Sequence, residues 1–377
     1  MIKKIDSYES IQELLLENRD IVLYGAGNYG ITMKDFLKKN YNIDISGFAV
    51  SNDIDIKSET IDEIYVKKLS QYDKESILII TVSEQHQAPL LNNAYEMGFS
   101  RVHILLNEFY RYMKSALIEN RLLPLEKLNF EVHITEHCNL NCKGCYHFSP
   151  LSEPDFLSVE EFNCDMERMA FICKEKVSSI TLLGGEPLLH PDIISFFKVI
   201  REYFPDCRVK LLTNGILLRW IPEKLIRAIR ETNTIVKMTL YPPLKEQIDD
   251  IVEFMRTKKI RFELSKIVDE FWTQININGD SDPKKMLNRC VNSDCVVLKR
   301  GRIAKCPISM NSNVFNNYFG TEIPQDILDL SDKSITSESM HKYFFDPIST
   351  CAYCGLEKYY EWEQTSGKVD VSEMICM

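Results

Sequence analysis

The chain has 377 residues, of which 45% are hydrophobic and 27% are charged, and its formal net charge is -10. This is the composition of a soluble globular protein with two or three domains. The acidic balance argues against a binder of polyanions, so we expect no nucleic-acid partner. No apolar run approaches the roughly 18–20 residues that a membrane span needs, and residues 1–4 lead into polar sequence.

These features predict a cytoplasmic protein without a membrane span. In that reducing compartment the twelve cysteines are better explained by metal or redox sites than by disulfides. The fold class that we expect is α/β, in four parts. These are a Rossmann-like domain over 1–110, a helical connector over 111–127, a partial (β/α)6 barrel over 128–280 and a small cysteine-rich domain over 281–377.

The N-terminal part carries a G-x-G-x-x-G turn, formed by Gly25, Gly27 and Gly30, between a strand-like and a helix-like run. Such glycines let a phosphate approach the N-terminus of the helix, as in dinucleotide-binding domains. The next predicted strand, 43–50, lacks the usual acidic residue at its end, and Asp53 comes three positions later. This weakens the prediction of NAD. Two interpretations stay open, a nucleotide site or glycines that only let the strand pack on the helix.

From residue 129 onward, apolar strand-like runs alternate with amphipathic helix-like runs. The alternation predicts a parallel sheet with helices on its outer face, curved into a partial barrel of about six strands. The predicted strands are 129–135, 178–183, 208–213, 235–240 and 261–266, and the predicted helices are 158–176, 192–204, 222–231 and 245–259.

Three cysteines follow the first of these strands in the spacing C-x3-C-x2-C, namely Cys138, Cys142 and Cys145. Three thiolates in one short loop can face a single iron-sulfur cube, and a 4Fe-4S cluster held by three cysteines keeps one iron open for another ligand. The alternative is a structural zinc site, which needs a fourth ligand at short spacing. Only His137 and His147 are available for that place.

Glycine-rich and polar turns follow the next strands, at the end of the predicted sheet where barrel folds build active sites. They are Gly184-Gly185-Glu186-Pro187 after the second strand, Thr213-Asn214 after the third and Tyr241 after the fourth. Thr213 and Asn214 can bind ribose hydroxyls or only satisfy their own turn. Tyr241 is a candidate catalytic residue whose role is open.

The cysteine spacing and the Gly-Gly-Glu-Pro turn together resemble the radical S-adenosylmethionine (SAM) enzymes, and the run 146–151, YHFSPL, strengthens the resemblance. It covers the chain from about residue 129 onward. The resemblance implies that the three cysteines hold a 4Fe-4S cluster and that SAM takes the open iron. It also implies that the turn 184–187 receives the methionine ammonium, for which its backbone is chemically suited.

The sequence departs from the family's pattern at Gly144, where an aromatic residue usually precedes the third cysteine. Tyr146, His147 or Phe148 would then pack on the adenine instead, and Tyr146 is the residue that we assign to this contact.

Five more clustered cysteines occur in the last part of the chain: Cys290, Cys295, Cys306, Cys351 and Cys354. The run 296–304 reads as a β-hairpin with a glycine at its turn, which would bring Cys295 and Cys306 side by side. The layout resembles the twitch form of the SPASM extension, which implies a second 4Fe-4S cluster. Cys306, Cys351 and Cys354 are the firmest ligands, while Cys290 and Cys295 compete for the fourth place. Zinc is the alternative for four thiolates.

The resemblance implies that a reduced cluster splits SAM to give a 5'-deoxyadenosyl radical, with a flavodoxin- or ferredoxin-type protein as electron donor. The N-terminal part resembles domains attached to sugar-modifying enzymes of surface-glycan pathways. We therefore expect hydrogen abstraction from a carbohydrate-type or nucleotide-linked small molecule, with oxidation, rearrangement or epimerisation as the outcome. Two alternatives are a peptide-modifying radical maturase and a non-catalytic nucleotide-sugar scaffold with structural clusters.

Overall fold

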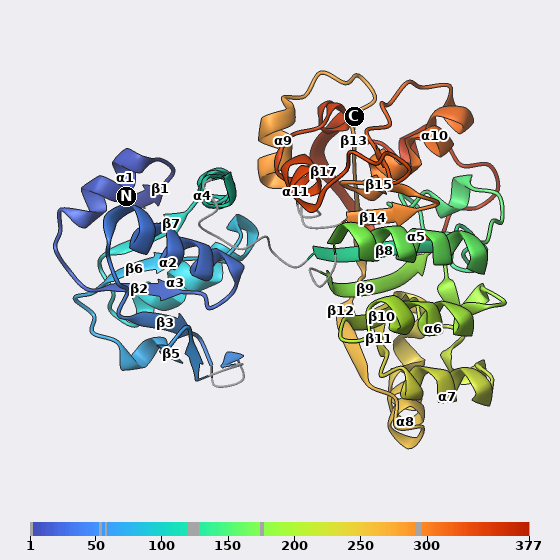
Figure 1. Cartoon of the computed structure of the whole chain (residues 1–377), viewed down its shortest axis with the longest axis horizontal. Helices are drawn as coiled ribbons and strands as arrows, with labels where there is room; N and C mark the ends of the chain where they lie inside the picture. The colour runs from blue at the N-terminus through green and yellow to red at the C-terminus, as the bar shows by residue number, and fades with distance from the viewer. Residues whose placement is uncertain are drawn as a thin grey trace. The chain divides into compact units, whose positions relative to one another are not determined.

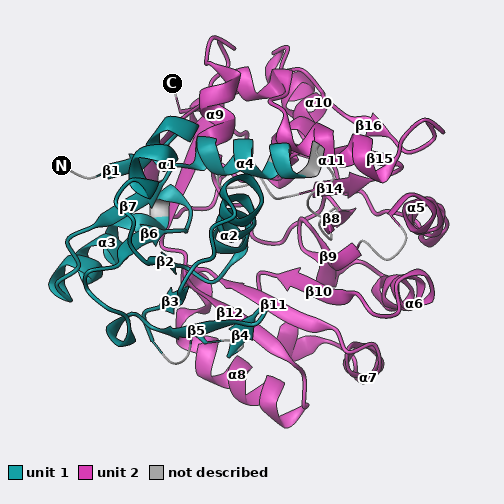
Figure 2. Ribbon diagram, turned by 60° about the vertical axis from the view of Figure 1, so that its left-hand side comes forward, with its two compact units in different colours: residues 1–124 teal, residues 125–377 magenta. Residues whose placement is uncertain are grey.

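The computed structural model describes residues 3–52, 55–56, 59–119, 128–173, 177–290 and 296–376. The chain divides into two compact units, Met1–Pro124 (unit 1) and Leu125–Met377 (unit 2) (Figure 2). The expected boundary between residues 280 and 281 lies inside unit 2. Asp53 and Cys295 lie outside the described residues. Within the described ranges, no helix is both long and apolar enough to cross a membrane.

Unit 1 is built on a seven-stranded sheet in the order β1-β7-β6-β2-β3-β5-β4, parallel except for the pair β4 and β5 (Figure 1). The order β5-β3-β2-β6-β7 is that of the nucleotide-binding doubly wound sheets. The strands are β1 (Lys3–Ile5), β2 (Ile21–Tyr24), β3 (Gly47–Val50), β4 (Thr60–Ile61), β5 (Ile64–Lys68), β6 (Ile77–Ile80) and β7 (Val102–Leu105). The helices are α1 (Tyr8–Leu15), α2 (Asn28–Tyr41), α3 (Gln87–Glu96) and α4 (Asn107–Glu119).

The central strands of unit 1 are continuous apolar runs because both faces of the sheet are covered. All residues of β2, β3 and β6 are buried, as expected for parallel strands between helix layers. The elements β1, α1, β4 and β5 were not predicted from the sequence. The expected connector 111–127 begins inside α4, which belongs to unit 1, and residues 120–127 lie outside the described residues.

Unit 2 contains an eight-stranded sheet in the order β12-β11-β10-β9-β8-β14-β15-β16. Five strands alternate with helices as the sequence predicts (Figure 1). They are β8 (Leu128–Thr135), β9 (Val177–Gly184), β10 (Arg208–Thr213), β11 (Ile235–Leu240) and β12 (Phe262–Ile267), with α5 (Val159–Cys173), α6 (Ile193–Tyr203), α7 (Glu223–Glu231) and α8 (Ile248–Thr257) between them. The mixed α/β fold with a partial barrel sheet is thus confirmed.

The sixth parallel strand of this sheet does not come from the βα series. It is β14 (Val296–Lys299), which pairs with β8 in the register Val296 to Phe130 and Leu298 to Val132. The predicted hairpin is confirmed, since β14 pairs antiparallel with β15 (Arg302–Ala304) and then with β16 (Leu328–Asp329). Both turn residues, Arg300 and Gly301, have positive φ angles of 47° and 69°, as a tight two-residue hairpin turn requires.

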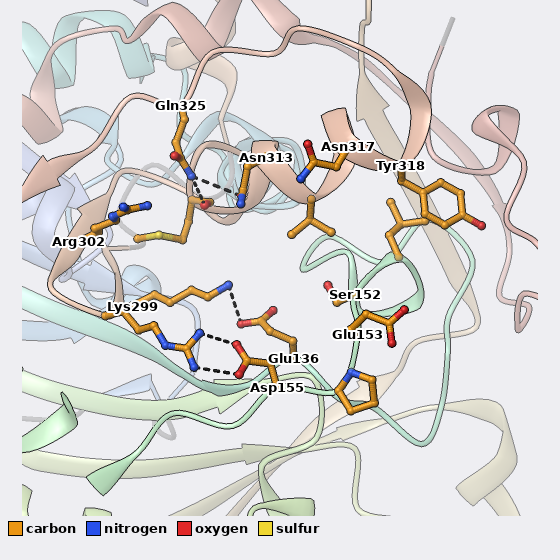
Figure 3. A pocket seen from close by; sticks show the side chains of 15 residues that line it. Glu136, Ser152, Glu153, Asp155, Lys299, Arg302, Asn313, Asn317, Tyr318 and Gln325 are labelled. Atoms are coloured by element: carbon orange, nitrogen blue, oxygen red, sulfur yellow. Dashed lines mark hydrogen bonds and ion pairs between the residues drawn. The ribbon is translucent and has the colours of Figure 1, made fainter. Parts of the chain in front are cut away.

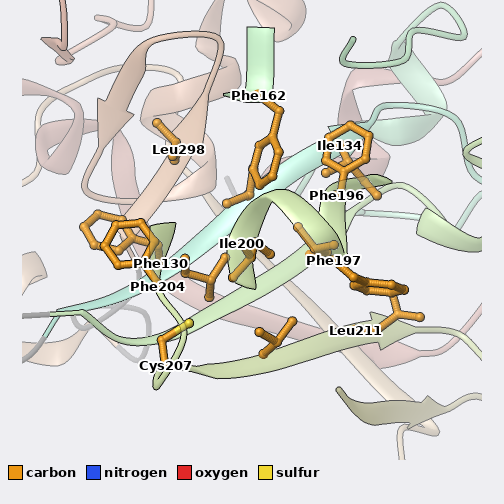
Figure 4. Close-up of a cluster of buried hydrophobic side chains, with 14 of the residues drawn as sticks. Phe130, Ile134, Phe162, Phe196, Phe197, Ile200, Phe204, Cys207, Leu211 and Leu298 are labelled. Atoms are coloured by element: carbon orange, nitrogen blue, oxygen red, sulfur yellow. The ribbon is translucent and has the colours of Figure 1, made fainter. Parts of the chain in front are cut away.

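A hydrophobic core between the sheet and helices α5 to α8 fixes the end of β8 that precedes the cysteine loop. Figure 4 shows Phe130 and Ile134 of β8 in one cluster with Phe162 of α5 and Phe196 of α6. The rings of Phe162 and Phe196 lie 4.7 Å apart. Leu298 of β14 belongs to the same cluster, so the C-terminal hairpin is packed into the barrel and does not form a separate core.

The described part of unit 2 also contains a two-stranded antiparallel sheet and three further α-helices. The sheet pairs β13 (Glu270–Ile275) with β17 (Cys354–Glu361). The helices are α9 (Pro283–Arg289), α10 (Pro307–Phe319) and α11 (Ser337–Phe345).

Candidate functional site

The loop with the first three cysteines begins where β8 ends, and it is held in a compact conformation. Gly144 has a φ of +63°, and a Cβ atom there would lie 2.0 Å from the hydroxyl of Tyr360 and 2.7 Å from Cγ2 of Thr273. The aromatic residue expected at position 144 from the family's pattern therefore cannot fit. The position belongs to glycine because β13 and β17 cover the loop.

The three thiols lie close together and face hydrogen-bond donors. The backbone N–H of Leu140 donates to Cys138 Sγ (3.5 Å) and the indole N–H of Trp362 donates to Cys142 Sγ (3.3 Å). Burial and the neighbouring thiols raise the pKa of Cys138 to about 11 and that of Cys142 to about 12. Burial also raises the pKa of Cys145, although backbone N–H groups of the following residues oppose this.

This donor set fits an iron-sulfur cluster. Thiolate ligands need nearby positive charge to ionise, which a bound metal centre supplies. The N–H groups aimed at the sulfurs are the hydrogen bonds that such clusters receive. Among the described residues, no three or more Cys, His, Asp or Glu side chains converge so as to hold a single metal ion. The ring of His147, a zinc candidate, instead contacts the ring nitrogen of His133 at 3.1 Å.

The Gly-Gly-Glu-Pro turn is bound directly to the start of the cysteine loop. The N–H of Gly185 donates to the carbonyl of Thr135, and the N–H of Glu186 donates to the carbonyl of His137, both at 2.7 Å. A Cβ atom would lie 2.0 Å from the Thr135 carbonyl oxygen at Gly184 and 2.1 Å from the His137 carbonyl oxygen at Gly185. Both glycines are therefore required for two backbone segments to lie against each other.

Glu186 is fully enclosed and joins the ends of β9 and β10. Its carboxylate accepts hydrogen bonds from the Thr213 hydroxyl (2.7 Å) and from the N–H groups of Asn214 (2.8 Å) and Leu188 (3.0 Å). Burial raises its pKa to about 7 in spite of these bonds. The Glu186 carboxylate and the Thr213 hydroxyl bond to each other, so these two residues hold the turn against the end of β10.

Asn214 continues this network to the cysteine loop. Its side-chain N–H donates to Asn139 Oδ1 at 2.7 Å and lies 3.9 Å from Cys138 Sγ, while its carbonyl oxygen accepts from the N–H of Ile216. The predicted residues 184–187, 213 and 214 are thus brought together beside the first cysteine motif. Pro187 begins the short helical turn after Glu186.

A strand segment near the C-terminus lies along the loop, and sequence reasoning missed it. Tyr360, Trp362 and Gln364 are spaced by two and contact successive parts of the loop. The Tyr360 hydroxyl donates to the carbonyl of Lys143 and the Gln364 amide donates to the carbonyl of Leu140, each at 2.7 Å. The alternation of these long polar and aromatic side chains is the signal that could have identified the segment, since every second side chain of a strand shares a face.

The aromatic candidates for the SAM site take different positions. The ring of Tyr241 lies 5.8 Å from that of Trp362, and burial together with the charges of the three thiols raises the pKa of Tyr241. Tyr146 points elsewhere, because its hydroxyl accepts from Gln274 at 2.6 Å and its ring packs edge-on against Trp272. Phe148 is buried against another ring in a hydrophobic cluster. Tyr241 and Trp362 therefore form an aromatic pair beside the first cysteine site.

Four of the five C-terminal cysteines line one small cavity together with Tyr146. They are Cys290, Cys306, Cys351 and Cys354. Cys306 caps the N-terminus of α10, where it accepts from the N–H of Ser309 at 3.4 Å, and a helix N-terminus favours a thiolate. Burial and two neighbouring thiols raise its pKa to about 12. Cys376, which the sequence did not single out, also raises the pKa of Cys354 through its charge.

Packing alone explains two of the three glycines in the glycine-rich turn of unit 1. A Cβ atom at Gly25 would lie 2.5 Å from the carbonyl oxygen of Thr81, and one at Gly30 would lie 2.1 Å from that of Gly25. Gly27 precedes α2 and has no atom within 4 Å of such a Cβ. It is the glycine of the three where a phosphate could approach.

Comparison with known proteins places the family resemblance in unit 2. Residues 132–271 match the model of the radical SAM superfamily. Among curated proteins, the chain is 37% identical over 120 residues to GTP 3',8-cyclase of Sulfurovum sp. (strain NBC37-1), a match over 31% of this chain and 36% of the relative. It is 28% identical over 150 residues to Molybdenum cofactor biosynthesis protein 1 of Bos taurus, covering 39% of this chain and 23% of the relative.

The chain thus spans only about a third of the length of the curated cyclase that it matches. A solved structure of BtrN in complex with AdoMet and 2-DOIA covers 61% of this chain and 93% of its own, with 18% identity and a TM-score of 0.42. The matched range 132–271 contains the cysteine loop, the Gly-Gly-Glu-Pro turn and strands β9 to β12. The similarity to the radical SAM superfamily therefore covers the segment that carries both motifs.

Proposed function

We propose that the protein is a radical SAM enzyme that acts on a sugar-bearing small molecule, with Cys138, Cys142 and Cys145 as ligands of a 4Fe-4S cluster. The observation that carries this proposal is the direct joining of the cysteine loop to the Gly-Gly-Glu-Pro turn through Thr135 and His137. A bound cluster with SAM would supply one electron to the sulfonium and so a carbon-centred radical. A flavodoxin- or ferredoxin-type protein is the proposed source of that electron.

The chain's own residues would hold SAM and keep other hydrogen donors away. The turn 184–187 presents backbone next to the cluster loop, and Glu186 holds this turn to the end of β10. Tyr241 and Trp362 border the same site and would limit access of water to it. Tyr241 stays our candidate for contact with the reacting molecule.

For the second site we propose Cys290, Cys306, Cys351 and Cys354 as ligands of another 4Fe-4S cluster. These four cysteines share one cavity, and Cys306 sits at a helix N-terminus. This choice assigns the fourth place to Cys290. A second cluster could accept an electron from a substrate radical, so we favour oxidation over epimerisation.

The substrate class rests on the relatives and on unit 1. The curated relative is named for a reaction of GTP, a molecule that carries a sugar. The strand order of unit 1 and the open position at Gly27 suit a nucleotide. Both observations support a nucleotide or nucleotide-linked sugar as substrate.

The test is anaerobic reconstitution with iron and sulfide, followed by dithionite and SAM. We expect 5'-deoxyadenosine, with a higher rate when GTP or a uridine or cytidine diphosphosugar is added. No 5'-deoxyadenosine from a sample with full iron content would refute the enzyme. Stimulation by peptides alone would refute the sugar-bearing substrate and support a peptide maturase.

Trp362→Phe tests the role given to the C-terminal strand segment. The variant keeps an aromatic ring, although a smaller one, and removes the N–H that donates to Cys142 Sγ. Hydrogen bonds to the sulfurs help to set the potential of an iron-sulfur cluster. We therefore expect a more negative midpoint potential for the first cluster in a titration followed by electron paramagnetic resonance. Trp220→Phe, at a side chain that is 79% exposed, is the matched control and should leave the potential unchanged.

A further inference from the structure

A second cavity of about 760 Å³ opens in unit 2, lined by the end of β8, residues 151–155, the hairpin β14–β15 and α10 (Figure 3). None of its lining residues belongs to either set of cysteines, to the turn 184–187 or to the aromatic pair Tyr241 and Trp362. Small-molecule pockets have volumes of about 300–1,000 Å³. The cavity is therefore large enough for a ligand, and it shares no lining residue with the proposed reaction site.

The charges on the cavity wall are balanced and mostly paired. Lys299 contacts Glu136 at 2.9 Å, and Arg300 forms a two-bond ion pair with Asp155 (Figure 3). The lining also contains one further acid, Glu153, and one further base, Arg302. A phosphate or polyphosphate site needs an excess of unpaired cations. This wall has no such excess, so it favours a neutral ligand.

The same wall still offers hydrogen-bonding groups. Glu136 is 4% exposed, and its Oε2 atom has no hydrogen-bond partner among the described residues. Lys299 Nζ uses two of its three N–H donors, on Glu136 and on Asn311 at 2.9 Å. A buried carboxylate oxygen without a donor is unfavourable. Because Glu136 lines the cavity beside Lys299, a ligand hydroxyl there can donate to this carboxylate.

The opposite wall, on α10, adds amides and apolar surface. Asn313 and Asn317 lie one turn apart, and Figure 3 shows both at the cavity, with Gln325 next to Asn313. An amide both donates and accepts, as a sugar hydroxyl does. Val314 and Met310 supply apolar surface between these groups. A set of amides, a carboxylate and small apolar contacts matches a molecule with many hydroxyl groups on a carbon ring.

We propose that this cavity binds a neutral sugar unit, with one hydroxyl donating to Glu136 and others paired with Lys299 and Asn317. The proposal goes beyond the radical reaction, because binding there needs neither the clusters nor SAM. It would give the enzyme a second carbohydrate-binding site, used to hold a non-reacting sugar.

Equilibrium dialysis with radiolabelled glucose, galactose and N-acetylglucosamine on the reconstituted enzyme tests this site. We expect saturable binding of at least one neutral sugar, unaffected by excess SAM and retained when Cys138, Cys142 and Cys145 are replaced. Glu136→Gln and Asn317→Leu should each weaken that binding about tenfold, the effect of losing one good hydrogen bond. If Glu136→Gln impairs folding, Asn317→Leu still tests the site, since Asn317 makes no hydrogen bond to the described part of the chain. Asn92→Leu, on the exposed face of α3, is the matched control.

Three results would overturn the proposal. The first is no saturable binding of any neutral sugar to the wild-type enzyme. The second is binding that both cavity variants retain in full, or that SAM displaces. Displacement by SAM would place the sugar at the reaction site. The third is tighter binding of glucose 6-phosphate than of glucose, which would make the cavity an anion site. Because none of these readouts uses 5'-deoxyadenosine, a failure here is distinct from a failure of the proposed enzyme.

Discussion

Replacement of Cys138, Cys142 and Cys145 by alanine is expected to abolish 5'-deoxyadenosine formation and to lower the iron content from about eight to about four per chain, the content of one cube. The physical reason is that the three thiols lie on one loop, close enough to raise one another's pKa values, and N–H groups face their sulfurs. Without thiolates this loop cannot hold iron. The four cysteines of the second cavity do not contribute to it.

Iron and sulfide analysis of the reconstituted variant measures this directly. Cys164→Ala, at an exposed cysteine of α5, is the matched control and should keep both the iron and the activity. If the triple variant retained no iron, the assignment of a second cluster would be wrong. If it retained all of the iron, the assignment of the first cluster to this loop would be wrong.

Gly185→Ala is expected to reduce 5'-deoxyadenosine formation about a hundredfold, the size of effect that small misplacements of bound groups produce. The added methyl group would lie 2.1 Å from the carbonyl oxygen of His137 and 3.0 Å from the backbone nitrogen of Cys138. Neither backbone atom can move without displacing the cysteine loop from the turn. The free energy of unfolding should fall by about 1–3 kcal/mol, as for other overpacked sites.

The measurements are SAM binding, the rate of 5'-deoxyadenosine formation and chemical denaturation of the same samples. Gly27→Ala is the matched control because its added methyl group meets no atom within 4 Å. It should leave stability and 5'-deoxyadenosine formation without substrate unchanged. Normal SAM binding and rate in Gly185→Ala would show that the turn does not need its close contact with the loop.

Much of the fold follows from local pattern. The alternation of apolar runs with amphipathic runs predicted β8 to β12 and the helices between them, and all of these elements are present. The hairpin β14–β15 was also predicted, because Gly301 marks its turn. Its pairing with β8 was not predicted, because the two strands lie more than 160 positions apart and no local pattern specifies a partner at that distance.

The candidate site shows the same division. The spacing of Cys138, Cys142 and Cys145 and the turn 184–187 predicted the first candidate site, and the structure joins the two segments by backbone hydrogen bonds. The sequence left two roles open for Thr213 and Asn214, ribose binding or hydrogen bonds within their own turn. In the structure their side chains bond to Glu186 and Asn139. Tyr146 was assigned to the adenine, but its hydroxyl contacts Gln274 beside the second set of cysteines.

By itself the sequence determined the radical SAM resemblance, the α/β class and the two groups of cysteines, because each depends on residues at fixed short spacing or on regular periodicity. Only the tertiary structure decided which side chains cover these groups. Trp362 reaches Cys142 from 220 positions away, and Cys290 joins Cys306, Cys351 and Cys354 at one cavity. It also explained Gly144, whose missing side chain leaves room for Tyr360. Such contacts depend on how distant strands pair and pack, and short-range spacing does not determine this.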